Sequence, residues 1–195
     1  MVSKFFAFLD RMKLIDRWAL MRNTAVEDVA QHTMQVAMIA HALCVIENTL
    51  FPSGTPLDAE KAAVLALYHE SAEVVTGDLP TPVKYYDGDI NRAYKNIEHR
   101  AEQKLVDTLP SELKAAFSCY VKPDKACPEY VYVKRADKLS ALIKCVEELA
   151  VGNKEFEKAY ASTLESLTGV PEKSVGYFLE TFIPAYSMSL DSLLD

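Results

Sequence analysis

The chain lacks several features that would place it in a special class. Its 195 residues contain four cysteines, with no CxxC pair, so a disulfide-stapled secreted domain is not indicated and the thiols are expected to be reduced. There is no basic run, and the formal net charge is −7, which argues against a protein that binds the nucleic-acid backbone. A small anionic substrate stays compatible with this charge, because a metal and one or two local cations can reverse the field inside a pocket.

Long hydrophobic runs are also missing near the start of the chain. Residues 1–22 alternate apolar and charged side chains, so they contain neither a signal-peptide core nor a membrane-spanning segment. No internal repeat, low-complexity linker or convincing alternating strand occurs; the segment 131–133 is the nearest to a strand and is too short. We therefore expect a cytoplasmic protein with no membrane partner.

Apolar residues at helical spacing dominate what remains. Half of the residues are apolar, which is enough for one continuous core in a chain of this length. Thr24 and Glu27 have the spacing of a capping box at the start of the second helix, and Asp58 can cap the third. The pattern predicts an all-α, single-domain helical bundle spanning residues 1–195, with helices at about 5–18, 28–48, 58–77, 90–109, 129–151, 155–167 and 172–194.

A stiff loop interrupts this pattern between residues 76 and 89. Pro80 and Pro82, with Gly77 and Gly88 on either side, prevent a helix from passing through it. A rigid polar loop that follows a helix is a common place for a binding site. Lys84 lies in this loop, where it could meet either a phosphate or solvent.

Four dispersed side chains could together hold one divalent metal. Nitrogen and carboxylate ligands of this kind suit zinc, manganese, iron or cobalt better than calcium or magnesium, which prefer oxygen alone. The candidates each lie in a stretch of helical periodicity: His32, His69, Glu70 and Asp137. Each also has an ordinary alternative, since an inward histidine is often a satisfied core residue and Asp137 could pair with neighbouring lysines.

Two further pairs extend the candidate site. Glu73 lies four residues after His69, so a ligand and an acid/base group could face one pocket; the alternative is a weak helix pair. Arg17 and Trp18 suit a ligand with a phosphate and a planar base, or could serve as a surface cation and an aromatic anchor. His41 and His99 have only the ordinary interpretation, His99 as a surface residue.

Together these residues resemble the HD-domain phosphohydrolases, and within them most closely the bacterial 5'-deoxynucleotidases. The resemblance covers nearly the whole chain and rests on four stretches, residues 11–18, 31–38, 68–85 and 134–137. It implies an HD-type helical bundle, a deoxynucleotide as substrate and a homodimer. A helix face formed by Phe178, Phe182 and Tyr186 could belong either to a dimer interface or to the core.

The resemblance also assigns roles by position. It implies that one divalent metal, cobalt, manganese or zinc, is held by His32, His69, Glu70 and Asp137, and that Glu73 is the catalytic acid/base. It implies that the following residues bind the substrate, with Lys84 added as a candidate from its loop: Arg17, Trp18, His32, Asp78, Leu79, Pro80, Thr81 and Asp137.

One position departs from the family pattern, because Glu70 stands where the family has Asp. The longer stem must fold back or move the metal, since metal sites hold their ligands to a few tenths of an ångström. We therefore expect metal-dependent hydrolysis of deoxyribonucleoside 5'-monophosphates, and keep two alternatives. One is a triphosphohydrolase that releases triphosphate from dATP; the other is a non-catalytic nucleotide-binding protein whose metal site Glu70 has disabled.

Overall fold

The computed structural model describes residues 2–84 and 86–195 and is built from helices throughout this part of the chain. Met1 and Tyr85, the last residue of the third matching stretch, lie outside the described residues. The α-helices are α1 Phe5–Leu9, α2 Val29–Leu50, α3 Ala59–Tyr68, α4 Glu73–Thr76, α5 Thr81–Lys84, α6 Gly88–Asp107, α7 Ser111–Val121, α8 Pro128–Ala150, α9 Glu157–Leu167, α10 Lys173–Thr181 and α11 Leu190–Leu194. Three 3₁₀ segments join them: η1 Asp10–Leu14, η2 Lys154–Phe156 and η3 Ile183–Ser187.

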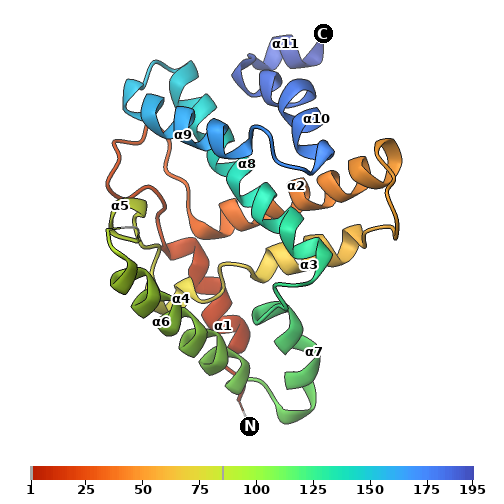
Figure 1. Ribbon diagram of the computed structural model, residues 1–195. Coiled ribbons are helices and arrows are strands. Elements are labelled where there is room, and N and C mark those ends of the chain that lie inside the picture. The colour runs from red at the N-terminus through yellow and green to blue at the C-terminus, as the bar shows by residue number, and fades with distance from the viewer. Residues whose placement is uncertain (1, 85) are drawn as a thin grey trace.

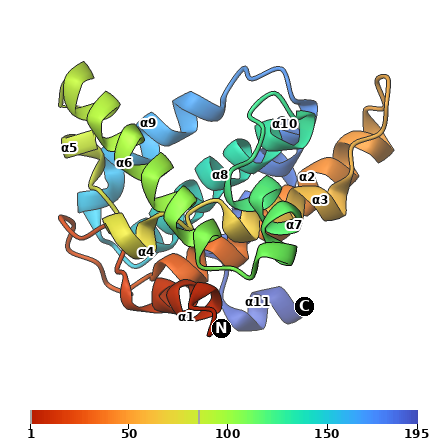
Figure 2. The same cartoon turned by 90° about the horizontal axis from the view of Figure 1, so that it is seen from below.

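The predicted all-α bundle is confirmed. Helices α2, α3 and α8 form its centre, with α1, α6 and α7 at one end and α9, α10 and α11 at the other, so the chain termini lie at opposite ends (Figure 1). In the view from below, α8 again runs beside α2 and α3, while α5 and α6 lie apart from α10 (Figure 2). Helices α2 and α8 are therefore the two elements on which most of the central and upper part of the bundle packs.

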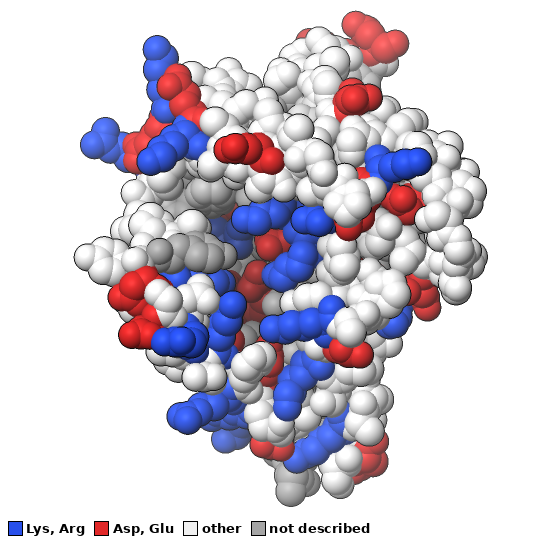
Figure 3. Space-filling model, in the orientation of Figure 1, with Lys and Arg blue, Asp and Glu red and all other residues white. Residues whose placement is uncertain are grey.

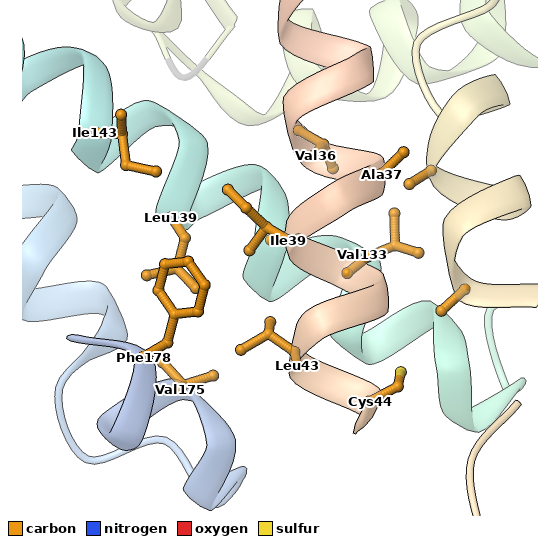
Figure 4. Packing of buried hydrophobic residues seen from close by; sticks show 14 of the residues in the cluster. Val36, Ala37, Ile39, Leu43, Cys44, Val133, Leu139, Ile143, Val175 and Phe178 are labelled. Carbon is orange, nitrogen blue, oxygen red and sulfur yellow. The ribbon is translucent and has the colours of Figure 1, made fainter. Parts of the chain in front are cut away.

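The main core forms where α8 and α10 meet α2. Leu139 of α8 and Phe178 of α10 are turned toward Ile39 and Leu43 of α2 (Figure 4), and all four are buried. Fully burying a side chain of this size contributes about 1.5–3 kcal/mol, so this contact fixes α8 against α2. Phe178 thus belongs to the core, whereas Phe182 keeps 42% of its surface exposed.

Helix α2 is, among the described residues, the one helix long and apolar enough to cross a membrane. Half of its most apolar window is buried inside the bundle, and it packs mainly against α3 and α8. Those properties are the ones expected of a core helix in a globular domain.

Several predicted helix boundaries were wrong. The first helix does not reach Trp18: it ends as η1 at Leu14, and Ile15 is extended. The helix predicted over 58–77 breaks into α3 and α4, and the one predicted over 172–194 breaks into α10, η3 and α11, with Pro184 in the first turn of η3. Helix α7 was missed, and the segment 76–89 contains the single turn α5.

The capping box of α2 was predicted four residues too early. Asp28, not Thr24, caps the helix: its carboxylate accepts from the Gln31 backbone N–H at 2.8 Å, and the Gln31 side chain accepts from the Asp28 backbone N–H at 3.0 Å. Thr24 instead donates its hydroxyl to Glu148 at 2.7 Å. A helix cap contributes only about 1 kcal/mol to stability. A hydrogen bond from Thr24 to a buried carboxylate can therefore be more favourable than a cap formed by Thr24.

Candidate functional site

Three helices bring the four candidate ligands together. His32 lies in the first turns of α2, His69 is the C-cap of α3, Glu70 follows in the turn before α4, and Asp137 lies on α8. One ligand atom from each residue lies within 4.8 Å of the ligand atoms of the other three. The packing of α3 and α8 on α2 therefore assembles a donor set of the size that one metal ion requires.

The proton on His32 can be assigned from its neighbours. Its Nδ1 lies 2.9 Å from the Ser140 hydroxyl, and that hydroxyl donates to Oε1 of Gln35 at 2.6 Å. Because the Ser140 proton is committed to Gln35, the serine oxygen accepts and His32 carries its proton on Nδ1. Its Nε2 is thus a bare lone pair, fully buried and without a hydrogen-bond partner.

His69 has the same tautomer for a simpler reason. Its Nδ1 lies 2.7 Å from the backbone carbonyl oxygen of Ala66, which can only accept, so Nδ1 carries the proton. Its Nε2 is also buried without a hydrogen-bond partner. Burial lowers the pKa of His69 to about 4, against the opposing charges of Glu70 and Asp137, which keeps the ring neutral and able to bind a metal near pH 7.

Both bare nitrogens face carboxylate oxygens. Nε2 of His32 lies 3.2 Å from Asp137, and Nε2 of His69 lies 3.3 Å from Glu70. A lone pair and a carboxylate are both acceptors, so these contacts need a cation to become favourable. The residues present therefore fit a divalent metal, and Glu70 reaches the set despite its longer stem.

Glu73 is buried beside this cluster. Its pKa is raised to about 10, first by burial, then by the charges of Glu70 and Asp78 and by a hydrogen bond with Glu70, which together outweigh Arg17. Glu73 therefore holds a proton at neutral pH. A protonated carboxylic acid next to a metal-type donor set is suited to general acid catalysis.

A cleft of about 650 Å³ opens onto the cluster. Glu70, Glu73 and Asp137 line it, whereas His32 is completely buried behind them. The space-filling view shows a hollow with Lys and Arg side chains around it and acidic side chains inside (Figure 3). The basic side chains at the rim would attract a negatively charged ligand. A metal bound inside the cleft would neutralise the carboxylates there, so that they would not repel this ligand.

The other substrate residues expected from the sequence line the same cleft. They are Arg17, Trp18, Asp78, Leu79, Pro80, Thr81 and Lys84. Burial raises the pKa of Asp78, although the positive charge of Arg17 acts to lower it. The Nζ atom of Lys84 lies 3.6 Å from Oε1 of Glu98 and 5.2 Å from the ring centre of Tyr94, so these two neighbours hold its ammonium group at the wall.

Sequence reasoning missed one wall of the cleft and the groups that orient the ligands. Lys138 on α8 and a face of α9 also line the cleft, the latter with Lys158, Ser162, Thr163 and Ser166. Ser140 and Gln35 orient His32. Polar residues on an amphipathic helix carry no signal that separates a cleft wall from a solvated face. His99 is exposed, as expected, and His41, expected to be an ordinary core histidine, is exposed as well; neither belongs to the ligand set or lines the cleft.

An all-helical bundle that buries two imidazoles against two carboxylates is the arrangement of an HD-domain phosphohydrolase. Solved structures agree with this class. The fold is similar to that of an HD-domain phosphohydrolase from Listeria innocua, with a TM-score of 0.82 and 23% identity over 94% of this chain and 88% of that one. It is also similar to a cyanophage S-2L HD phosphohydrolase bound to dA and one catalytic zinc ion, with a TM-score of 0.61 and 18% identity over 91% of this chain and 95% of that one.

Sequence comparisons narrow the class to one family. The family described as 5'-deoxynucleotidase YfbR-like matches residues 4–186. The 5'-deoxynucleotidases of Erwinia tasmaniensis and Photorhabdus laumondii are each 46% identical to this chain over 98% of its length, which covers 96% and 97% of theirs. The chain therefore belongs to the YfbR-like 5'-deoxynucleotidases, and the resemblance stated from the sequence is confirmed.

Proposed function

We propose that this protein hydrolyses deoxyribonucleoside 5'-monophosphates to deoxynucleosides and phosphate with the help of one divalent transition metal. The observation that carries the proposal is the pair of bare Nε2 atoms of His32 and His69, each facing a carboxylate behind a cleft that Arg17 and Trp18 line. Membership of the 5'-deoxynucleotidase family supports the choice of substrate.

His32, His69, Glu70 and Asp137 would hold the metal, which is cobalt, manganese or zinc. When bound, such an ion polarises a phosphoryl oxygen and lowers the pKa of a coordinated water to about 7. The neutral imidazoles suit this role because a metal ligand must be deprotonated at the coordinating atom. The Nδ1–H bonds to Ser140 and Ala66 keep both Nε2 atoms aimed at the ion.

Arg17 and Lys84 would bind the phosphate at the wall of the cleft. Arg17 contributes a planar guanidinium that can bind two phosphate oxygens, and Lys84 contributes a single charge. Trp18 and residues 78–81 would enclose the sugar and base, so a 2'-hydroxyl would meet a steric or hydrogen-bonding penalty there. Asp137 would face the phosphate from the metal side, whereas His32, buried behind the carboxylates, would contact the metal alone.

Glu73 would supply the proton that the reaction needs. Water attacks the phosphorus in line, the bond from phosphorus to the 5'-oxygen breaks, and that oxygen takes up a proton from Glu73 as it leaves. The water keeps one hydrogen on the phosphate product and loses the other, which restores the proton on Glu73. Glu73 holds a proton at neutral pH because burial and neighbouring carboxylates raise its pKa to about 10. General acid catalysis of this kind typically contributes about 10²–10⁴-fold to the rate.

The substrate class can be tested by identifying products. Phosphorus NMR would follow purified protein with dAMP, AMP and dATP in separate samples, with cobalt or manganese and with a chelator control. We expect inorganic phosphate from dAMP, far less from AMP, and none after chelation. Release of triphosphate from dATP would assign the triphosphohydrolase activity instead, and no turnover of any substrate would identify a binding protein.

Glu70 can be tested separately by restoring the family residue. Glu70 already lies with the other ligands, so we expect Glu70→Asp to leave the dAMP rate unchanged or lower. We expect its cobalt affinity, measured by titration calorimetry, to stay within about tenfold of the parent protein, which corresponds to 1.4 kcal/mol. A large gain of activity in Glu70→Asp would instead identify Glu70 as the residue that disables the site.

Three further properties stay predictions: that the chain forms one domain over residues 1–195, that it is cytoplasmic, and that it is a homodimer. The family match over residues 4–186 supports the first, membership of the family supports the second, and the family resemblance alone supports the third. Light scattering of the purified protein would give a molar mass of 21.8 kDa for a monomer and twice that for the dimer.

A further inference from the structure

The pair Arg17 and Trp18 lies on a segment without helical support. The chain is extended at Ile15 after η1 ends, and α2 begins only at Val29. Trp18 has a φ angle of 59°, a left-handed conformation that a bulky residue rarely adopts unless its surroundings hold it there. The segment therefore needs partners elsewhere to keep these two side chains at the cleft.

One carboxylate oxygen of Glu27 bonds both side chains. Arg17 donates its Nε–H to Oε2 of Glu27 at 3.2 Å, and Trp18 donates its indole N–H to the same oxygen at 3.0 Å. The side chains of Arg17 and Glu27 are only 11% and 15% exposed, so water competes little for these bonds. Two donors that share one charged acceptor are fixed relative to each other as well as to the chain.

The backbone reinforces this arrangement. The Arg17 backbone N–H donates to the Glu27 carbonyl at 2.9 Å, and Asp16 and Asp28 form an isolated antiparallel bridge. Glu27 is thus tied to the Arg17 backbone and side chain together. On another side, the ring of Trp18 packs on Phe156, with 5.3 Å between ring centres.

Glu27 itself stays out of the cleft. Arg17 and Trp18 line the cleft, and Glu27 is absent from its lining among the described residues. The bond to Glu27 uses Nε of Arg17 and leaves the two terminal nitrogens of the guanidinium for a phosphate. Glu27 can therefore act on a substrate only through the two residues that it holds.

We propose that Glu27 is a positioning residue that holds Arg17 and Trp18 in one arrangement and thereby sets the preference for a deoxyribose over a ribose. The kinetic part rests on the proposed function, whereas the placement of Trp18 does not. A carboxylate at position 27 keeps Trp18 where a 2'-hydroxyl would collide with it or lose its water. Weakening that contact lets the indole move aside and admits the ribonucleotide.

The variant Glu27→Gln tests this with little change of shape. An amide keeps one weaker acceptor but loses the charge that both bonds use. The matched control is Glu172→Gln, because Glu172 accepts from the Nε–H of Arg135 at 2.7 Å and is also largely buried, but lies away from the cleft. Thermal unfolding of both variants sets the temperature range in which each is folded.

Trp18 is the only tryptophan in the chain, so its fluorescence reports its position without any turnover. We expect Glu27→Gln to shift the emission to longer wavelength and to increase quenching by acrylamide, because the indole N–H loses its charged partner. Glu172→Gln should leave both unchanged. Unaltered emission and quenching in Glu27→Gln would overturn the proposal.

Kinetics with dAMP and AMP test the selectivity. For Glu27→Gln we expect kcat/KM for dAMP to fall about tenfold, mainly through KM, as for the loss of one charge-assisted bond. We expect the ratio of kcat/KM for dAMP to that for AMP to fall by about threefold or more. An equal loss for both nucleotides would overturn the selectivity role and leave only a structural one.

Two additional measurements keep the outcomes separate. If the parent protein does not hydrolyse dAMP, the proposed function fails by that result alone, and fluorescence titration with dAMP and with AMP still compares the two ligands in both variants. If Glu27→Gln is unfolded, Glu27→Asp keeps the charge on a shorter stem. It should give an intermediate emission shift together with reduced selectivity, and a shifted emission with parent-like selectivity would contradict the proposal.

Discussion

The Nε2 atom of His32 lies 3.2 Å from Oδ1 of Asp137, and neither atom carries a hydrogen. The His32 proton is on Nδ1, where the Ser140 hydroxyl accepts it. Burial would raise the pKa of Asp137, but nearby positive charge, that of Lys134 first, holds it well below its usual range. The protein thus folds two acceptors against each other, an arrangement that stabilises a bound cation and weakens the metal-free state.

The first prediction follows from that contact. In Asp137→Asn, the amide N–H₂ can donate to Nε2 of His32, so we expect the metal-free protein to gain about 1 kcal/mol in the free energy of unfolding. Cobalt should raise the melting temperature of the parent protein but not of the variant, since a ligand that binds only the folded state stabilises it. Chemical unfolding with chelator and thermal unfolding with cobalt measure the two effects.

Loss of the ion pair with Lys134, at 3.6 Å from Asp137, is a separate consequence of that substitution. The variant Lys134→Met removes the pair and keeps both acceptors in place, so it should show no gain. A metal-free Asp137→Asn protein that is less stable than the Lys134→Met protein, which has lost the same ion pair, by 1 kcal/mol or more would contradict the tautomer assigned to His32.

The second prediction concerns Ser140, which holds the His32 ring. Ser140→Ala removes the acceptor for Nδ1–H, so the ring can rotate or change tautomer. We expect cobalt affinity to fall about 10–100-fold, as for other groups that orient metal ligands. Titration calorimetry measures this directly.

The matched control is Ser174→Ala. Ser174 is fully buried as well, but its hydroxyl oxygen has no hydrogen-bond partner and it lies on α10, away from the candidate ligands. This variant should bind cobalt as the parent does. Equal affinity in Ser140→Ala and Ser174→Ala would show that the Ser140 hydroxyl does not orient His32.

The third prediction concerns the proton on Glu73. Glu73→Gln keeps the shape of the protonated acid and cannot release a proton, so we expect kcat for dAMP to fall by about 10²–10⁴-fold with KM little changed. Steady-state kinetics measure both parameters. Cobalt titration should show that the metal still binds, and a variant with parent-like kcat would exclude Glu73 as the acid.

The fourth prediction concerns pH and stability at Glu148, which is 1% exposed. Burial would raise its pKa, but hydrogen bonds from Lys144, Asn153 and Thr24 lower it from 4.5 to about 2. Because the pKa is lowered on folding, the ionised Glu148 side chain stabilises the fold fully above about pH 4.5, and this stabilisation is lost as the pH falls toward 2. By linkage it amounts to about 3 kcal/mol at pH 7.

We therefore expect Glu148→Gln to unfold at lower urea concentration than the parent at pH 7, and this difference to shrink steadily between pH 4.5 and pH 2.5. Asp10→Asn is the control, because Asp10 pairs with Lys13 on the exposed surface and such pairs contribute little. A difference between Glu148→Gln and the parent that does not change with pH would contradict the linkage.

Much of the fold could be predicted because the core helices carry their own signal. Helices α2, α6 and α8 are 20–23 residues long, and apolar residues recur along them at helical spacing. Helix α7 has 11 residues and buries only Val121, so its periodicity was too weak to recognise. The breaks after Leu14 and Tyr68 were missed because local spacing there continues without interruption.

The sequence by itself determined the chemistry that is available: which residues can ligate a metal, which can carry a proton, and which family pattern they follow. Only the tertiary structure decided what each one does. Thr24 and Glu27 have capping-box spacing, yet Glu148 binds Thr24 and Glu27 binds Arg17 and Trp18. The Nδ1 partner of His32 and the burial that raises the pKa of Glu73 also arise from packing. Local patterns are settled by neighbours a few residues away, whereas a side-chain partner can come from far along the chain, as Ser140 does for His32 over 108 positions and Glu148 for Thr24 over 124.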